Sequence, residues 1–442
     1  MTTTNENNGR NDSGGEHRQR SRTVEGEQAD RYREENAALQ IKIEALQRTI
    51  DEQKRALASL GSNQELRKRL HQTLAQVHAE SQPIHVVPEA GDDSAMTSFA
   101  RAFPEARTFE WQATRDTLYA NADERFNAVC HIFHHDWVGM RSAVGALPGW
   151  KLSIPSANAM PVRDIEVIIG LLREHGVGKL IMHGISDPMY ALSRSLTRAG
   201  YDQQYLVWHG TTTQWVWDDE RRFAQRAIQM AREGKIKRFS AIRRGLGPIV
   251  GERNFAPQLV NMPPRFAQGA VAHRSHRGDK CSALAPSWND LRKNLATNVL
   301  AAQTVERVGD IFVVAKNFDL PKWLAPKVRK VPYRDHTSML EMMATMDIVL
   351  NVTTIDCHPM VDLEAMSVGT PCVRGPLFLD GLEDHAYVRA TAVDNPMSVE
   401  DVARCIDRVL GIEAQELQGM MNDYKRALLE LSRQRYVEFL EI

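Results

Sequence analysis

The sequence has little of what marks secreted, membrane-spanning or strongly charged proteins. Its 5 cysteines in 442 residues are scattered and form no CxxC pair, which argues against a zinc ribbon or a disulfide framework. Lys and Arg number 55 against 56 Asp and Glu, so the net charge gives no reason to expect a nucleic-acid or membrane partner. No apolar run approaches the roughly 18 residues of a membrane span, and the polar N-terminus lacks the apolar stretch of a secretory signal. We therefore expect a cytoplasmic protein.

Apolar residues are also rare at the start of the chain. Residues 1–30 contain only Met1, Val24 and Ala29 as apolar residues. A segment of this composition cannot bury enough surface to offset the entropy lost on ordering. We predict a disordered tail.

A coiled coil is predicted over 31–80, with its heptad pattern over 32–60. Ile43 and Ile50 occupy position a, and the d positions are mainly leucine. β-Branched residues at a with leucine at d favour a parallel two-stranded coiled coil, and a polar residue at a, here Asn36, can specify the pairing. We therefore predict a homodimer formed through 32–60. The alternative is a single amphipathic helix that lies on the globular body.

Two α/β domains are predicted after a linker over 81–120 that contains Pro83, Pro88 and Gly91. Short apolar runs then alternate with amphipathic segments, which is typical of doubly wound parallel sheets. We place the domains at 121–265 and 266–442, the second ending in a helix. The expected strands are 128–133, 151–154, 179–182, 204–208, 282–285, 310–315, 347–350 and 370–373. The expected helices are 140–147, 164–175, 189–199, 291–305, 360–367 and 398–410. Ligands of such sheets bind beyond the carboxyl ends of the strands, so two facing sheets predict an interdomain cleft.

The segment 347–374 holds the most informative group of polar residues. A strand is followed by a polar loop with Asp356, and a helix begins near Pro359. Free amides at a helix start, with the positive end of the helix dipole, predict a phosphate site. Glu364, one turn into the helix, can accept two hydrogen bonds from a ribose diol. The alternative is that Glu364 only caps or solvates the helix. The amides concerned lie around His358, Met360 and Val361.

This segment resembles the donor-binding signature of the retaining GT-B glycosyltransferases of family 4, also called glycosyl transferases group 1. That signature is an acid, seven residues, Glu, then Ala-Met and Gly-Thr-Pro, and this chain has Asp356, Glu364-Ala-Met366 and Gly369-Thr-Pro371. The resemblance implies two Rossmann-like domains that face a cleft, with the acceptor on the N-terminal side and a nucleotide-diphosphate sugar on the C-terminal side. It also implies that Glu364 binds the ribose, and that Asp356 and the amides after it meet the sugar and phosphates. The family usually has the longer Glu at position 356.

Cations for the diphosphate are expected at the first strand–helix junction of the C-terminal domain. The family uses an Arg and a Lys there. Lys293 fits the lysine, Trp288 stands in place of the arginine, and Arg292 is a possible substitute. Adjacent residues of a helix do not share a face, so we favour Lys293 over Arg292. The alternative for both is solvated surface charge.

His209 closes an apolar strand in the motif Trp208-His-Gly-Thr211. A histidine at such a strand end is expected to project into the cleft and to titrate near neutrality. It resembles the strand-end histidine of the same glycosyltransferases, and also the WHGT motif of wall-teichoic-type glycerophosphotransferases, another GT-B group. Both resemblances imply a place in the active site. The alternative is a buried histidine that hydrogen-bonds within the core.

A second polar group follows the first strand. His131, His134, His135 and Asp136 form HxxHHD, for which metal binding has to be considered, but no further Cys/His pair supports a metal. We expect instead an acceptor-side loop, in which Gly139 allows close approach of a phosphate and Asp136 orients the acceptor. No Rossmann glycine fingerprint follows any expected strand, so no nicotinamide or flavin cofactor is predicted.

The sequence thus predicts a metal-independent glycosyltransferase, specifically a hexosyltransferase, that acts with retention and has His209 and Asp356 as catalytic residues. Its acceptor is left open between a glycan, a protein and a modified nucleic acid. Two other classes remain. One is a GT-B glycerophosphotransferase or sugar-nucleotide epimerase, and the other is a non-catalytic coiled-coil scaffold with a decayed transferase domain.

Overall fold

The computed structural model describes residues 108–112, 120–157, 159–251, 255–265, 280–315 and 318–442. The predicted tail over 1–30, the coiled coil over 31–80 with its dimer seam at 32–60, and most of the linker over 81–120 lie outside the described residues. All described residues belong to the same compact unit.

The N-terminal domain is built on a six-stranded sheet with the order β1-β3-β2-β4-β5-β6. Only β1 is antiparallel to its neighbour, β3. Its strands are β1 (Glu110–Gln112), β2 (Val129–His134), β3 (Trp150–Ile154), β4 (Lys179–His183), β5 (Gln204–Trp208) and β6 (Arg238–Ala241). Its helices are α4 (Val138–Gly145), α5 (Val162–Glu174), α6 (Asp187–Arg198), α7 (Asp218–Arg232) and α8 (Gly247–Val250).

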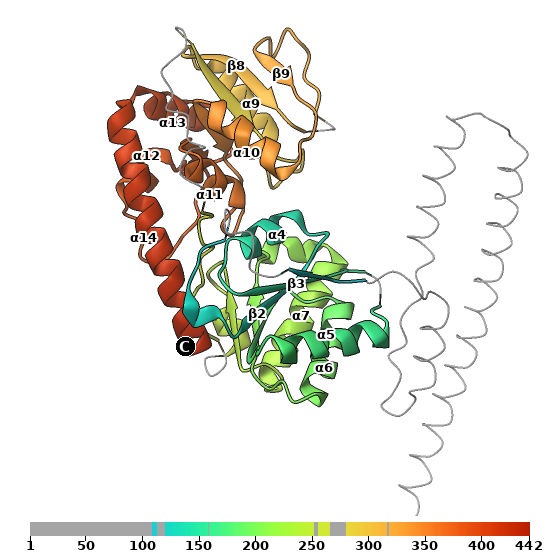
Figure 1. The fold of residues 1–442 in the computed structure, drawn as a ribbon. Helices are drawn as coiled ribbons and strands as arrows, with labels where there is room; N and C mark the ends of the chain where they lie inside the picture. Colours follow the sequence, from blue (N-terminus) through green and yellow to red (C-terminus); the bar gives the residue numbers. More distant parts are fainter. Residues whose placement is uncertain (1–107, 113–119, 158, 252–254, 266–279, 316–317) are drawn as a thin grey trace, which may run out of the picture. The chain divides into compact units, whose positions relative to one another are not determined.

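Both faces of this sheet are covered, as its continuous apolar strands require. Successive residues of a strand point to opposite faces. In β5, Leu206 and Trp208 belong to the core formed with α5, α6 and α7, whereas Tyr205 and Val207 belong to the core formed with the last helix of the chain. Figure 1 shows α5, α6 and α7 together beside the strands.

The C-terminal domain has a five-stranded, fully parallel sheet with the order β11-β10-β7-β8-β9. Helices α9 and α13 belong to one core cluster of this domain, and α10 belongs to a second. The predicted doubly wound architecture is therefore confirmed for both domains. The strands are β7 (Cys281–Ala285), β8 (Val308–Val313), β9 (Val328–Lys330), β10 (Ile348–Asn351) and β11 (Cys372–Arg374). The helices are α9 (Leu295–Thr304), α10 (His336–Thr345), α11 (Met360–Ser367), α12 (Ala386–Thr391) and α13 (Val399–Gly411).

The last helix, α14 (Ala414–Leu440), fastens the two domains to each other. Near its start, Met421 and Tyr424 are buried in the core of the C-terminal domain. Near its end, Tyr436 and Phe439 are buried against the N-terminal sheet. Figure 1 shows this helix in red, running from one domain to the other. A single continuous helix therefore packs against both domains.

The local structure differs from the expected elements in two places. The helix expected over 291–305 begins only at Leu295, because Asn294 adopts left-handed backbone angles and the residues before it form turns. Helix α7 and strand β6 were not predicted from the sequence. Helix α7 is rich in charged residues and buries only small side chains and one methionine, so its apolar pattern is weak in the sequence.

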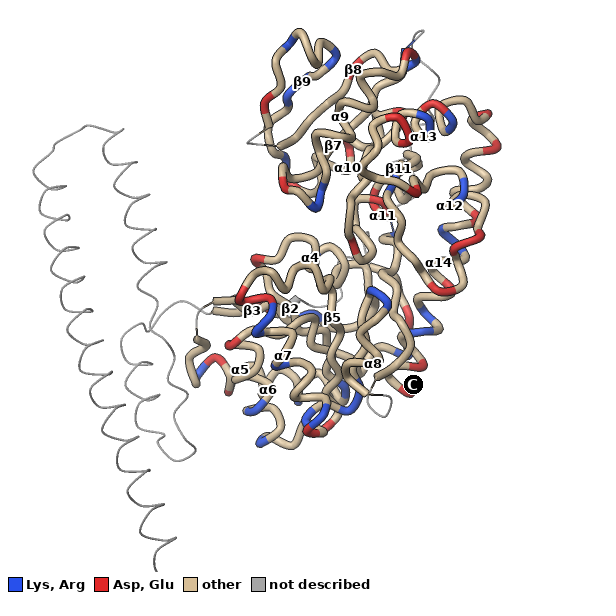
Figure 2. Tube along the Cα trace, turned by 180° about the vertical axis from the view of Figure 1, so that it is seen from behind, with Lys and Arg blue, Asp and Glu red and all other residues tan. Residues whose placement is uncertain are grey.

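Charged residues of both signs occur throughout the described part of the chain. Blue and red segments are interspersed along both domains in Figure 2. In the part of the chain that the structure describes, no helix is both long and apolar enough to cross a membrane. All five cysteines are buried and free.

Candidate functional site

A cavity of about 1070 Å³ lies between the two sheets, at the carboxyl ends of their strands. Its walls come from the segments that follow β2, β4, β5, β7, β8, β9 and β10. Nearly all of the predicted site residues line it, namely Gly139, His209, Arg292, Lys293, Asp356, His358, Met360, Val361 and Glu364. The remaining one, Asp136, is exposed, is not among the lining residues and accepts a hydrogen bond from Ser156. The structure therefore gathers the predicted residues, and their roles stay predictions.

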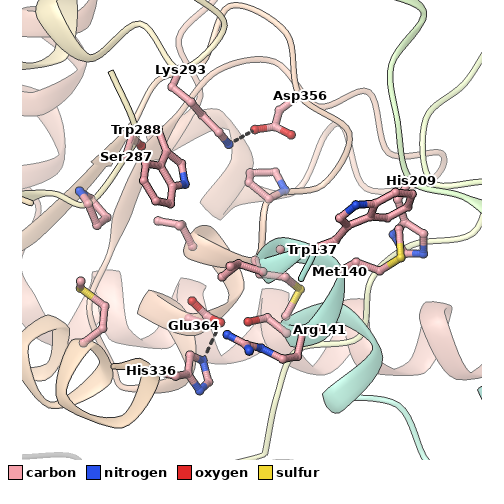
Figure 3. Close-up of a pocket in the computed structure, with 18 of the residues that line it drawn as sticks. Trp137, Met140, Arg141, His209, Ser287, Trp288, Lys293, His336, Asp356 and Glu364 are labelled. Carbon is pink, nitrogen blue, oxygen red and sulfur yellow. Dashed lines mark hydrogen bonds and ion pairs between the residues drawn. The ribbon is translucent and has the colours of Figure 1, made fainter. Parts of the chain in front are cut away.

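Lys293 and Arg292 both reach the carboxylate of Asp356. Lys293 Nζ lies 2.7 Å from Asp356 Oδ2, and Arg292 Nη1 lies 3.5 Å from Oδ1. The reason for preferring Lys293, that adjacent helical residues diverge, does not apply here, because both residues lie in the turns before α9. A turn lets neighbouring side chains converge. The result is two cations around one buried carboxylate at the wall of the cavity. Figure 3 shows the pair formed by Lys293 and Asp356.

Asp356 is held ionised by these neighbours. Burial by itself would raise the pKa of the carboxyl group, but the positive charges of Lys293 and Arg292 outweigh burial and hold the pKa below its ordinary value. The backbone N–H of Cys357 donates to Oδ1 at 2.9 Å. Arg243, from the N-terminal domain, donates to the backbone carbonyl of Asp356. The loop that carries Asp356 is thus held by both domains.

Helix α11 begins at the cavity without a side-chain cap. Its N-cap residue is Pro359, which makes no side-chain capping hydrogen bond, so no N-cap side chain occupies the first-turn amides around Met360 and Val361. His358 is buried just before this helix. Its Nδ1 accepts from the backbone N–H of Asn261 at 3.0 Å, so the ring proton sits on Nε2. Burial lowers the pKa of His358 to about 3, so the ring stays neutral beside the helix start.

Glu364 is buried at the cavity wall and contacts His336. His336 Nε2 lies 2.9 Å from Glu364 Oε1. Figure 3 shows this pair on the opposite side of the cavity from Lys293 and Asp356. His336, the first residue of α10, was not among the predicted residues, because nothing in the local sequence links it to Glu364.

On the N-terminal side, α4 and the residue before it form part of the cavity wall, together with the segments after β4 and β5. Trp137, Met140 and Arg141 face the cavity from this side (Figure 3). Gly139 lies in the first turn of α4, and a Cβ placed there would meet nothing within 4 Å. Gly184 has a different reason to be glycine: its φ is +77°, and a Cβ would come within 2.9 Å of the Trp137 ring. It allows Trp137 to pack onto the end of β4.

His209 lies where the sequence places it, but its titration differs from the expectation. It is half-buried at the cavity, and burial lowers its pKa to about 4 rather than leaving it near neutrality. Its Nε2 lies 2.9 Å from Nδ1 of the buried His183. The backbone carbonyl of His209 accepts from Cys357 Sγ at 2.9 Å. His209 is therefore a neutral group fixed from the core side.

The histidines of the HxxHHD motif contact different partners. Both ring nitrogens of His131 are engaged, with His183 Nε2 and with the Pro148 carbonyl, each at 2.9 Å. His134 Nδ1 lies 3.2 Å from the Pro155 carbonyl. Among the described residues, no group of three or more His, Cys, Asp or Glu side chains is arranged to hold a metal ion.

Other cavity residues carry no motif that would have revealed them. Glu220, in the first turn of α7, has a pKa raised by burial, an effect that Arg292 opposes. Trp288 and Tyr333 are half exposed, line the cavity and stack with ring centroids 6.1 Å apart. Their sequence signal is weak, because isolated aromatic residues in loops are common on protein surfaces.

No family model matches the sequence, and no curated protein matches it. Solved structures with a similar fold include a glycosyltransferase from Rickettsia africae, at 12% identity and a TM-score of 0.49, covering 71% of this chain and 98% of that one. Another is sucrose-phosphate synthase from Thermosynechococcus elongatus, at 13% identity and a TM-score of 0.44, covering 71% of this chain and 96% of that one. A third is a UDP-forming α,α-trehalose-phosphate synthase from Burkholderia xenovorans, at 9% identity and a TM-score of 0.47, covering 71% of this chain and 99% of that one. The likeness is one of fold alone. The described residues have the predicted GT-B fold, two doubly wound α/β domains that face a common cleft.

Proposed function

We propose that this protein is a glycosyltransferase that moves a sugar, in the simplest case a hexose, from a nucleotide-diphosphate donor to an acceptor with retention of configuration. The observation that carries the proposal is the meeting of Lys293, the uncapped start of α11 and Glu364 around one cavity. Cation and amides suit a diphosphate, and a buried carboxylate suits a ribose diol. The donor-side roles of Arg292, His358, Met360 and Val361 belong to the same proposal.

Glycosyl transfer in such a site depends mainly on positioning donor and acceptor and on stabilising the negative charge of the leaving diphosphate. Lys293 and the amides of α11 face the place where negative charge grows as the diphosphate leaves, and such preorganised groups are effective in a site shielded from water. The Asp356 carboxylate keeps Lys293 in place at 2.7 Å. No metal ion or other cofactor is needed for this step, since the two cations Lys293 and Arg292 stand beside the cavity.

The acceptor is proposed to enter beside α4, where Gly139 leaves open space. A glycan, a protein and a modified nucleic acid all remain open as acceptors. A cavity of about 1070 Å³ is slightly larger than the usual range for small-molecule sites, roughly 300–1,000 Å³, so donor and acceptor sugar can be held together.

A thermal-shift screen across UDP, GDP, CDP and dTDP sugars tests the proposal. We expect one base and sugar to raise the melting temperature, and that donor to be consumed when an acceptor is present. The anomeric configuration of the product, read by NMR, tests retention. A response only to a CDP-linked polyol would indicate a glycerophosphotransferase, and turnover of a sugar nucleotide without acceptor would indicate an epimerase. If no nucleotide sugar binds, the non-catalytic scaffold is the better description.

A further inference from the structure

Three histidines from three neighbouring segments of the N-terminal sheet form a continuous chain of hydrogen bonds. His131 lies on β2, His183 ends β4 and His209 follows β5, and these strands are adjacent in the order β2-β4-β5. His131 Nδ1 lies 2.9 Å from His183 Nε2, and His183 Nδ1 lies 2.9 Å from His209 Nε2. His131 and His183 are fully buried, and His209 reaches the cavity.

The inner end of the chain decides where the protons sit. His131 Nε2 lies 2.9 Å from the Pro148 carbonyl, which can only accept, so this nitrogen carries a proton. A neutral His131 then accepts at Nδ1 from His183 Nε2–H. His183 in turn accepts at Nδ1 from His209 Nε2–H. In this arrangement His209 is neutral and presents the lone pair of Nδ1.

The opposite arrangement would need a charged His131, with every bond of the chain reversed. Burial, followed by the positive charge of Lys151, lowers the pKa of His131 to about 3 and so disfavours that state. Lys151 is itself fixed in the core, where its ammonium group donates to the carbonyls of Leu147 at 2.6 Å and Gly149 at 2.7 Å. The chain also ends at a carbonyl, which cannot take up a proton. It is therefore suited to holding a ring, and not to conducting protons.

We propose that His131 and His183 are positioning residues that lock His209 as the Nε2–H tautomer, so that its Nδ1 accepts a hydrogen bond from a hydroxyl group of the sugar bound in the cleft. Among the described residues, Nδ1 of His209 has no hydrogen-bond partner, and the ring lines the cavity. The two ring nitrogens point to different sides, so fixing Nε2 toward the core directs Nδ1 away from His183. The sugar as ligand rests on the proposed function, whereas the locked tautomer does not.

The lock is tested without any ligand, on protein labelled with ¹⁵N at histidine and kept near pH 7. We expect protonated Nε2 on all three rings, slow exchange of the two bridging protons with solvent, and scalar coupling across the two N–H···N bonds. A proton on Nδ1 of His209, or a charged ring in the chain, would overturn the lock.

Variants at His183 test the consequence for binding. His183→Leu removes both contacts, whereas His183→Asn keeps a carbonyl oxygen near the position of Nδ1. The probes are UDP and UDP-glucose, or the equivalent pair for the base that the thermal-shift screen selects. We expect His183→Leu to leave nucleotide affinity unchanged and to reduce the extra affinity given by the sugar roughly tenfold, about the worth of one hydrogen bond. His183→Asn should restore most of it.

The outcomes separate the two levels of the proposal. Equal loss of nucleotide and nucleotide-sugar affinity in His183→Leu, with no rescue by His183→Asn, indicates a merely structural role and overturns the positioning role. Intact coupling in the wild type with no binding of any sugar nucleotide overturns the sugar contact and the proposed glycosyl transfer, but leaves the lock established. Thermal unfolding of both variants checks that they are folded.

Discussion

Lys293 and Asp356 are 63 positions apart in the chain, and the ammonium nitrogen of one lies 2.7 Å from a carboxylate oxygen of the other. The first belongs to the turn before α9 and the second to the loop before α11. Because β7 and β10 are neighbours in the sheet, the loops that follow them meet at the same edge. The pair joins the predicted diphosphate cation to the predicted sugar-side acid.

Replacing Lys293 by Ala should lower turnover roughly 100-fold or more, since it removes a preorganised charge that faces the departing diphosphate. Steady-state kcat with the donor found in the screen measures the effect. Arg292→Ala serves as the matched variant, and we expect a smaller loss because Arg292 is farther from Asp356, at 3.5 Å. Normal turnover in Lys293→Ala would remove the assignment.

Replacing Glu364 by Ala should weaken binding of the nucleotide diphosphate by about 1.5–3 kcal/mol, the usual worth of a hydrogen bond to a charged group. Isothermal titration with the free nucleotide measures this directly. His336→Ala should have a smaller effect, since it removes a contact of Glu364 and leaves the carboxylate in place. Glu430→Ala, an exposed change on α14, should have none. A folded Glu364→Ala protein with unchanged affinity would rule out the ribose role.

Gly139 offers a substitution whose structural cost is small. A Cβ there meets open space in the first turn of a helix, where Ala is favoured over Gly, so Gly139→Ala should leave the free energy of unfolding unchanged or raise it by up to about 1 kcal/mol. Gly139→Leu should raise the KM for the acceptor, because the side chain would project into the cavity. Gly170→Leu on the exposed face of α5 is the control, since Gly170 also has open space. If Gly139→Ala, Gly139→Leu and Gly170→Leu have the same KM for the acceptor, the acceptor binds elsewhere.

Activity should persist in EDTA, because Lys293, Arg292 and the amides of α11 can serve the diphosphate without a metal ion. The assay compares initial rates before and after extended treatment with the chelator. Complete loss of activity that Mn²⁺ or Zn²⁺ restores would contradict the prediction and would favour metal binding by the HxxHHD segment. A partial loss restored equally by any salt would reflect ionic strength only, and the prediction would stand.

The buried histidines should make the protein lose stability in mild acid. Burial lowers the pKa of His131 and His358 to about 3 and of His134 and His209 to about 4, against about 6.5 in an unfolded chain. Between these values the unfolded chain binds more protons than the folded one. The free energy of unfolding should therefore fall as the pH drops below about 6.5, by up to about 1.4 kcal/mol per pH unit for each histidine.

Urea unfolding at several pH values from 7.5 to about 4.5 measures this slope. His134→Gln removes one of the four groups without touching the donor side of the cavity. Its slope should be smaller by about one proton. An unchanged slope would show that His134 takes up no proton on unfolding in this range.

Much of the donor side could be predicted from local sequence. Helix α11 has the bounds that its pattern predicts, and its uncapped start, Asp356 and Glu364 are fixed relative to one another by a short loop and one helical turn. Spacing along the chain determines such geometry, since few conformations connect a buried strand to the helix after it. The same holds for His209, which directly follows a buried strand.

The contacts between distant segments were decided only by the tertiary structure. The order of strands in a sheet is not written in any one segment, yet that order brings His131, His183 and His209 together and lowers the pKa of each. Similarly, one left-handed residue, Asn294, ends the turn before α9 and lets Arg292 and Lys293 converge on Asp356. The sequence by itself determined most of the strands and helices, because the apolar pattern of a segment is local, but it did not reveal α7 or β6. The protonation and pairing of the site residues depend on burial and on partners that only the assembled sheets provide.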